Sequence, residues 1–248
     1  METIISQNAR EASRAAGSAV ADLVRNKPTA VLGLATGGTP QRLYEELIRA
    51  RREEGLDFSR VVTFNLDEYV GLGPNDSRSY HFYMWKNLFS HINIKPENAR
   101  VPNGLAADVP ASCAAYERAI AAAGGIDLQV LGLGENGHIG FNEPGSAFDS
   151  RTRVETLSAQ TIRNNARFFG GDEKRVPRHS VTMGLATIME ARRILLLAFG
   201  DAKAAAVAAM IEGPVATKLP ASVLQHHPDA QVFLDPSAAA ALKRARFA

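Results

Sequence analysis

Cysteine is almost absent from this sequence, and long apolar runs are absent altogether. The single cysteine, Cys113, allows neither an intramolecular disulfide nor a zinc site built from several thiolates. It lies in an alanine-rich stretch, so we expect a small, buried packing residue on a helix. No apolar run reaches the ~18 residues of a membrane-spanning helix, which predicts that the chain has no membrane partner.

An excess of charge of one sign is also lacking. The 28 basic and 26 acidic residues nearly cancel, leaving a net charge of +2, and no long basic run exists. A nucleic-acid partner is therefore not expected. Residues 1–5 lack the basic region followed by an apolar segment that marks a secretory signal, so the expected location is the cytoplasm.

Strands and helices are expected to alternate along the chain. Apolar segments typical of buried strands lie at residues 30–34, 60–66, 127–133, 193–199 and 230–234. Helical periodicity or composition lies at 6–25, 41–54, 80–89, 111–123, 184–191, 200–212 and 237–244. This order predicts an α/β fold with a doubly wound, mostly parallel, Rossmann-like sheet and helices on both faces.

One domain, residues 1–248, is expected because neither an internal repeat nor a low-complexity linker divides the chain. The polar segment 150–179 shows little periodicity. A loop of that length inside a compact domain tends to be functional, so we expect a mobile lid over the site, at roughly residues 158–180.

The strand at 127–133 leads into the sequence G-E-N-G-H-I-G-F-N-E-P at 134–144. Open α/β sheets bind ligands at the carboxyl ends of their strands, and glycines let the backbone approach a small substrate. His138 and Glu143 could exchange protons if this loop folds back on itself. A glycine-rich turn with one solvated histidine fits the spacing equally well.

Three of these glycines, Gly132, Gly134 and Gly137, also satisfy the G-x-G-x-x-G pattern of dinucleotide-binding proteins. That pattern normally opens the first strand–helix unit and is followed ~20 residues later by an acid on a second strand. Here it lies mid-chain, and Asp149 and Glu155 follow in a polar stretch. We therefore expect no nicotinamide cofactor.

A second strand end, at 30–34, is followed by Thr36, Gly37, Gly38 and Thr39 and then by a helix. Backbone N–H groups, two hydroxyls and a helix N-terminus suit a phosphate group. The segment lacks the G-K-[ST] ending of a nucleotide-binding P-loop. A simple strand–helix turn is the alternative.

A third strand end, at 60–66, is followed by Asp67 and Glu68. Because an isolated buried carboxylate is costly, one acid could be a base and the other could cap the next segment; two solvated acids are the alternative. Arg167 in the expected lid and Lys203 near a helix start could each bind phosphate, although a lone cation is more commonly a surface charge.

Together these stretches resemble the glucosamine-6-phosphate deaminases. The resemblance rests on L-G-L-A-T-G-G-T-P at 32–40, F-N-L-D-E-Y-V-G-L at 64–72, the histidine motif at 134–144, S-R-T-R-V at 150–154, N-N-A-R-F-F at 164–169 and V-P-R-H-S-V-T-M-G at 176–184. It covers nearly the whole chain in order. The T-G-G-T segment alone would also fit the related 6-phosphogluconolactonases.

The resemblance implies conversion of glucosamine 6-phosphate to fructose 6-phosphate and ammonium, in amino-sugar catabolism, with neither cofactor nor metal. His138 would open the sugar ring, with Asn136 and Glu143 orienting it. Asp67 would take the proton from carbon 2 and return one to carbon 1. The phosphate would be held by Thr36, Gly37, Gly38, Thr39, Arg167 and Lys203.

Two departures from the family pattern matter. Some members have Asp at the position of Asn136. Hexameric members that respond to N-acetylglucosamine 6-phosphate carry a second Ser and a Lys where this chain has Ala147 and Glu155, and this chain ends soon after Phe247. We therefore expect no allosteric activation, and a monomer or small homo-oligomer.

Two other functions compete with deamination. A 6-phosphogluconolactonase would use His138 to activate water and would not need Asp67 as a carbon base. A non-catalytic sugar-phosphate sensor usually carries a DNA-binding segment, and no helix-turn-helix pattern precedes residue 30.

Overall fold

A seven-stranded sheet forms the centre of the molecule in the computed structural model, which describes residues 1–243. Its strands run in the order β1-β10-β9-β6-β2-β3-β5, and every pair of neighbours is parallel. The strands are β1 (Glu2–Ile5), β2 (Val31–Leu34), β3 (Val62–Asn65), β5 (Ala99–Arg100), β6 (Leu128–Gly132), β9 (Arg193–Ala198) and β10 (Ala230–Leu234). The predicted doubly wound, mostly parallel α/β fold is confirmed.

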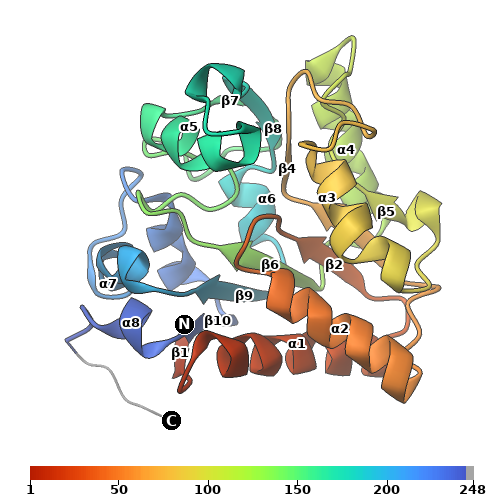
Figure 1. The fold of residues 1–248 in the computed structure, drawn as a ribbon, viewed down its shortest axis with the longest axis horizontal. Coiled ribbons are helices and arrows are strands. Elements are labelled where there is room, and N and C mark those ends of the chain that lie inside the picture. The colour runs from red at the N-terminus through yellow and green to blue at the C-terminus, as the bar shows by residue number, and fades with distance from the viewer. Residues whose placement is uncertain (244–248) are drawn as a thin grey trace.

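Helices cover both faces of this sheet (Figure 1). One face packs against α1 (Ala9–Asn26), α2 (Gln41–Glu54) and α3 (Tyr80–Asn87). The other packs against α4 (Val109–Ala122), α6 (Leu185–Met189), α7 (Ala204–Glu212) and α8 (Pro236–Ala239). Because both faces are buried, strands such as β9 place Ile194 and Leu196 in one core and Leu195 and Leu197 in the other, and read as continuous apolar runs.

A second, antiparallel sheet lies beyond the carboxyl ends of the central strands (Figure 1). It contains β4 (Asp67–Tyr69), β8 (His179–Thr182) and β7 (Arg153–Thr156), in that order. Only Leu66 separates β3 from β4, so the chain passes directly from one sheet into the other. Asp67 is therefore the first residue of a new strand, where the sequence predicted only the end of the strand at 60–66.

The segment 150–179, predicted to lack regular structure, is largely folded. It contains β7, α5 (Ala159–Asn165) and the 3-10 turns η3 (Ala166–Phe169) and η4 (Glu173–Arg175). A small core that includes Tyr69, Phe141, Ile162 and Phe169 holds it to the rest of the protein. The apolar residues of this core are widely spaced in sequence, so local periodicity does not predict them.

Other differences from the predicted elements are small. The sequence missed β1 and β5, which are short edge strands, and the predicted helix 237–244 ends at Ala239; Arg244 and Phe247 lie outside the described residues. Cys113 is buried, as expected. None of the helices in residues 1–243 is both long and apolar enough to span a bilayer. The remaining 3-10 turns are η1 (Phe89–His91), η2 (Pro96–Asn98), η5 (Asp201–Lys203) and η6 (Pro220–His226).

A buried aspartate joins three elements at the amino ends of the central strands. Asp127 is 5% exposed and accepts hydrogen bonds from Lys27 (2.8 Å), Arg192 (2.7 Å) and the backbone N–H of Val31 (2.9 Å). Burial by itself raises the pKa of Asp127, but these donors outweigh it and hold the pKa below its usual value. The carboxylate is thus the stable form.

We expect Asp127→Asn to destabilise the fold by about 1–3 kcal/mol at pH 7, the cost of leaving buried polar groups imperfectly paired. A depressed folded-state pKa contributes stability above the unfolded pKa, and this contribution is lost as pH falls through the folded pKa. The difference between the two proteins in urea unfolding should therefore narrow below about pH 4. Asp22→Asn, which alters an exposed pair with Arg25, is the matched control and should have no measurable effect.

Candidate active site

The three predicted strand ends and the predicted lid surround one cavity of about 740 Å³ at the carboxyl edge of the central sheet. Eight of the ten residues predicted for the site line this cavity: Thr36, Gly37, Gly38, Thr39, Asp67, His138, Arg167 and Lys203. Asn136 and Glu143 do not line it and instead contact the loop and side chain of His138. Parallel strands bring their carboxyl ends to a common edge, which is why segments distant in sequence meet here.

One side of the cavity is suited to an anion. The loop 36–39 leaves β2 and precedes α2, and Gly37 adopts a positive φ of 95°, a conformation that favours glycine. Burial lowers the pKa of Lys203; among the neighbouring charges, Glu135 opposes this shift and Arg167 adds to it. Arg167 and Lys203 line the same cavity as the loop that precedes α2, so cations and a helix N-terminus face one space, which suits a phosphate.

Asp67 presents a buried carboxyl group to the same cavity. It is 6% exposed, and burial, followed by the negative charge of Glu68, raises its pKa to about 8. A β-carbon at Gly140 would approach Asp67 Oδ2 within 3.6 Å, so the histidine loop passes directly beside this carboxyl. Once ionised, such a carboxylate is a far stronger base than one in water.

His138 occupies the loop that follows β6. Its side chain is 21% exposed, and its Nδ1 lies 3.8 Å from Glu143 Oε2. Burial lowers the pKa of His138, whereas Glu143 raises it and Lys203 lowers it further. A β-carbon at Gly134 would lie only 2.4 Å from the imidazole, so only glycine leaves room for the ring there. The loop therefore folds back on itself, which was the condition for His138 and Glu143 to lie close enough to exchange protons.

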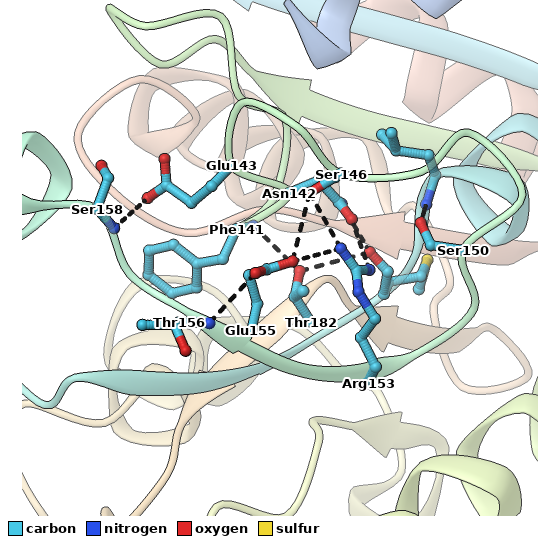
Figure 2. A network of polar contacts seen from close by, with 12 residues as sticks. Phe141, Asn142, Glu143, Ser146, Ser150, Arg153, Glu155, Thr156, Ser158 and Thr182 are labelled. Carbon is cyan, nitrogen blue, oxygen red and sulfur yellow. Dashed lines mark hydrogen bonds and ion pairs between the residues drawn. The ribbon is translucent and has the colours of Figure 1, made fainter. Parts of the chain in front are cut away.

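Asn136 fixes the position of Glu143. Its Nδ2 donates to Glu143 Oε2 (2.8 Å), and its Oδ1 accepts from the backbone N–H of His138 (3.2 Å). The other carboxylate oxygen of Glu143 accepts from the N–H of Ser158 (3.1 Å), the N-cap of α5 (Figure 2). Glu143 therefore joins the histidine loop to the beginning of the predicted lid.

An arginine-centred network holds the same loop to the second sheet (Figure 2). Arg153 on β7 donates to Asn142 Oδ1 (2.9 Å) and Ser146 Oγ (3.0 Å), and its guanidinium also pairs with Glu155. Asn142 in turn donates to the carbonyl of Met183 (2.8 Å), at the end of β8. The loop is thus fixed from both sides.

Sequence reasoning missed several polar side chains that line the cavity: Arg42, Arg78, Tyr80, Tyr83 and Glu135. Arg42 lies in the first turn of the helix that follows the phosphate-type loop, so its position could have been inferred from spacing. The two tyrosines reach the site from α3, whose placement depends on long-range packing. No local pattern marks them.

Comparison with known proteins is consistent with this arrangement. Residues 5–233 match the family model described as glucosamine-6-phosphate isomerases/6-phosphogluconolactonase. The chain belongs to this family. A glucosamine-6-phosphate deaminase of Thermoanaerobacter pseudethanolicus is 50% identical over 239 residues, which are 96% of this chain and 94% of that protein.

Solved structures separate the two branches of the family. A monomeric glucosamine-6-phosphate deaminase superposes with a TM-score of 0.95 at 47% identity, covering 97% of this chain and all of that one. The 6-phosphogluconolactonase of Trypanosoma cruzi superposes with a TM-score of 0.77 at 21% identity, covering 98% of this chain and 97% of that one. The second likeness shows a shared fold only.

The position of Asn136 leads to a prediction about His138. In Asn136→Asp a second carboxylate would lie against Glu143, and the added negative charge would favour the imidazolium form. We expect the variant to keep activity within roughly tenfold: the bond from residue 136 to Glu143 is lost, but the backbone N–H of His138 still donates to residue 136, now to a charged acceptor. The limb of the pH profile that depends on His138 should move to higher pH, since more base is needed to remove a stabilised proton.

Turnover measured against pH for both proteins tests this prediction. Asn136→Ala is the matched control, because it removes the hydrogen bond to Glu143 without adding a charge. The His138-dependent limb of the pH profile of Asn136→Ala should not move to higher pH. A limb that stays in place in Asn136→Asp, with ring opening shown to limit the rate, would contradict an electrostatic link between residue 136 and His138.

Proposed function

We propose that this protein deaminates glucosamine 6-phosphate to fructose 6-phosphate and ammonium. The observation that carries the proposal is the arrangement of one cavity, in which a cationic side holds Arg167 and Lys203 while Asp67 and His138 face the same space. The deaminase relative at 50% identity supports the same activity. Binding energy from the phosphate would position the reacting carbons.

The proposed reaction divides proton transfer between two groups. His138 moves the proton between the ring oxygen and the hydroxyl of carbon 1 as the ring opens. Asp67 removes the proton from carbon 2 and returns one to carbon 1, through an enolamine. Water then adds at carbon 2 and ammonia leaves. The reaction needs a base near carbons 1 and 2 and a separate acid/base near the ring oxygen, and Asp67 and His138 follow different strands of the sheet.

The environment of Asp67 suits an amino sugar. Burial and the charge of Glu68 hold its pKa at about 8 in the absence of substrate. A substrate ammonium group beside it would favour the ionised form, because an opposite charge within ~4–6 Å lowers a carboxyl pKa. The substrate itself would then help to prepare the base.

The two competing functions have less support. Lactone hydrolysis needs no base for a carbon-bound proton, so it leaves the buried Asp67 without a role, and the lactonase likeness is limited to the fold. Against the sensor alternative, the deaminase relative is 50% identical over 96% of this chain, which favours catalysis. We therefore retain deamination.

A monomer is the proposed assembly, supported by the monomeric deaminase that superposes at 47% identity. The cytoplasmic location, the mobility of the lid, and the absence of a nucleic-acid partner stay predictions of the sequence.

Asp67→Asn tests the proposed base. We expect the variant to bind substrate but to release ammonia ~10²–10⁴ times more slowly, the range for a lost general base. In deuterated water, wild-type product should carry deuterium at carbon 1, and the variant product should not. Normal deuterium incorporation in the variant would refute the role of Asp67. The conservative control is Asp76→Asn, because Asp76 pairs with Arg78 and has its pKa lowered to about 2, so it cannot be a base with a raised pKa.

A second prediction concerns regulation. Responsive family members have Lys at the position of Glu155, whereas here Glu155 puts a negative charge in this segment and pairs with Arg153, which disfavours an added phosphate group. We expect hyperbolic kinetics and no activation by N-acetylglucosamine 6-phosphate. Initial rates over a range of substrate, with and without this ligand, give the answer; sigmoidal curves that the ligand straightens would contradict it.

A further inference from the structure

Glu68 is a buried carboxylate to which the reaction assigns no role. It is 2% exposed and does not line the cavity. It follows Asp67 directly on β4, and successive side chains of a strand point to opposite faces. Asp67 therefore faces the cavity while Glu68 faces α3, and one short piece of backbone carries both.

Glu68 holds the amino end of α3. Its Oε1 accepts from the N–H groups of Tyr69 and Tyr80, and its Oε2 from that of His81, each at 2.9 Å. Tyr80 and His81 are the first residues of α3, whose first N–H groups have no partner within the helix. Ser79 Oγ accepts the next one, from Phe82 (3.0 Å). The N–H groups of Tyr80, His81 and Phe82, which have no partner within the helix, are thus each accepted by a side-chain oxygen of Glu68 or Ser79.

Helix α3 in turn supports the loop that faces the phosphate. The hydroxyl of Tyr83 donates to the carbonyl of Gly37 (2.6 Å). The hydroxyl of Tyr80 donates to the hydroxyl of Tyr69 (3.3 Å), and Tyr80 lines the cavity together with Thr36. A continuous set of contacts therefore runs from the backbone of Asp67, through Glu68 and α3, to the loop 36–39.

We propose that Glu68 is a positioning residue that sets the separation between the base Asp67 and the phosphate-binding loop 36–39. The proposal rests on the deaminase function above. A substrate held at its phosphate reacts only when the base lies at the correct distance from carbon 2, and a misplacement of ~1 Å can cost ~10²-fold in rate. Glu68 fixes that distance because it joins the strand of the base to the helix that supports the loop.

The charge of Glu68 has a second effect, on the protonation of Asp67. The other titratable groups around Asp67 are Tyr44 on α2, Tyr69 on β4, Tyr80 on α3 and Tyr116 on α4. Burial raises the pKa of each of them, so they stay neutral. Glu68 is thus the neighbouring charge that raises the pKa of Asp67, in addition to burial.

Around Glu68 itself, the remaining groups are Asp76 and His81. Asp76 is paired with Arg78, and burial lowers the pKa of His81, so this ring is neutral near pH 7. The carboxylate of Glu68 therefore depends on the three backbone N–H groups for stabilisation. Burial first raises its pKa, to about 7, and these N–H groups oppose that rise.

Two substitutions separate the effect of the charge of Glu68 from the effect of its side-chain length. Glu68→Gln keeps the size of the side chain but removes the charge and one acceptor. The acid limb of kcat/KM, which reports ionisation of Asp67, should move to lower pH by roughly one unit, because a neighbouring negative charge no longer disfavours the second one. Glu68→Asp keeps the charge but shortens the side chain by one methylene. Its limb should stay in place while kcat falls roughly tenfold or more.

Ser79→Ala is the matched control. It removes the third capping bond at the same helix end without changing any charge. Thermal unfolding should show a loss of stability, as in the Glu68 variants, but the acid limb should not move. Isothermal titration with inorganic phosphate gives the active fraction of each preparation. Its affinity should be unchanged within about threefold in all three variants, because the loop 36–39 retains its own donors.

The pH profiles of kcat/KM are all measured with the same substrate. Ionisation of the substrate therefore contributes equally to each profile and does not affect the differences between them. An unmoved limb in Glu68→Gln, an equal shift in Ser79→Ala, or a normal kcat in Glu68→Asp would overturn the proposal. The titration of Asp67 in substrate-free protein, followed by ¹³C NMR of its carboxyl carbon, gives the same test without turnover. If the wild type releases no ammonia, the deaminase function fails, and this titration still decides the role of the Glu68 charge.

Discussion

A carboxyl group buried as deeply as that of Asp67 loses most of the hydration that stabilises its charge. The surrounding structure therefore has to keep this group in place even though its ionisation is unfavourable. Backbone pairing does so: β4 pairs with β8, with Asp67 opposite Thr182, and the same short strand carries Glu68. A base that burial makes strong is thus fixed by hydrogen bonds that do not involve its own carboxylate.

The second sheet performs the same task for the histidine loop. Thr182 Oγ1 accepts from the N–H of Phe141 (3.0 Å), and Arg153 reaches Asn142 from β7. The strands that position Asp67 therefore also position the loop of His138, although the two residues follow different strands of the central sheet. Relative placement of two reacting groups is the quantity that a rate depends on most steeply, and one small sheet determines both positions.

Much of the fold could be predicted from sequence because β2, β3, β6, β9 and β10 are buried on both faces and read as apolar runs. The ends of three of these strands identified the polar loops of the site, and Lys203 follows β9. β7 could not be found in this way: its residues alternate between partly buried and exposed positions and carry charge. The sequence did suggest that one of Asp67 and Glu68 caps the next segment, and Glu68 does so at α3. Which acid takes this role could not be predicted, because it depends on partners brought together only by the tertiary fold.

The pairing of β1 with β10 has a consequence for how the protein is made. Glu2 lies opposite Gln231, and their side chains bond across 229 positions of sequence. Strand β1 must remain unpaired until β10, far later in the sequence, has been synthesised. Contacts between residues this distant in sequence form late and slowly, because the chain loses the entropy of closing a long loop before the pairing stabilises it. Strand β1 consequently stays without a partner until β10 has formed, and in that interval it can pair with other chains.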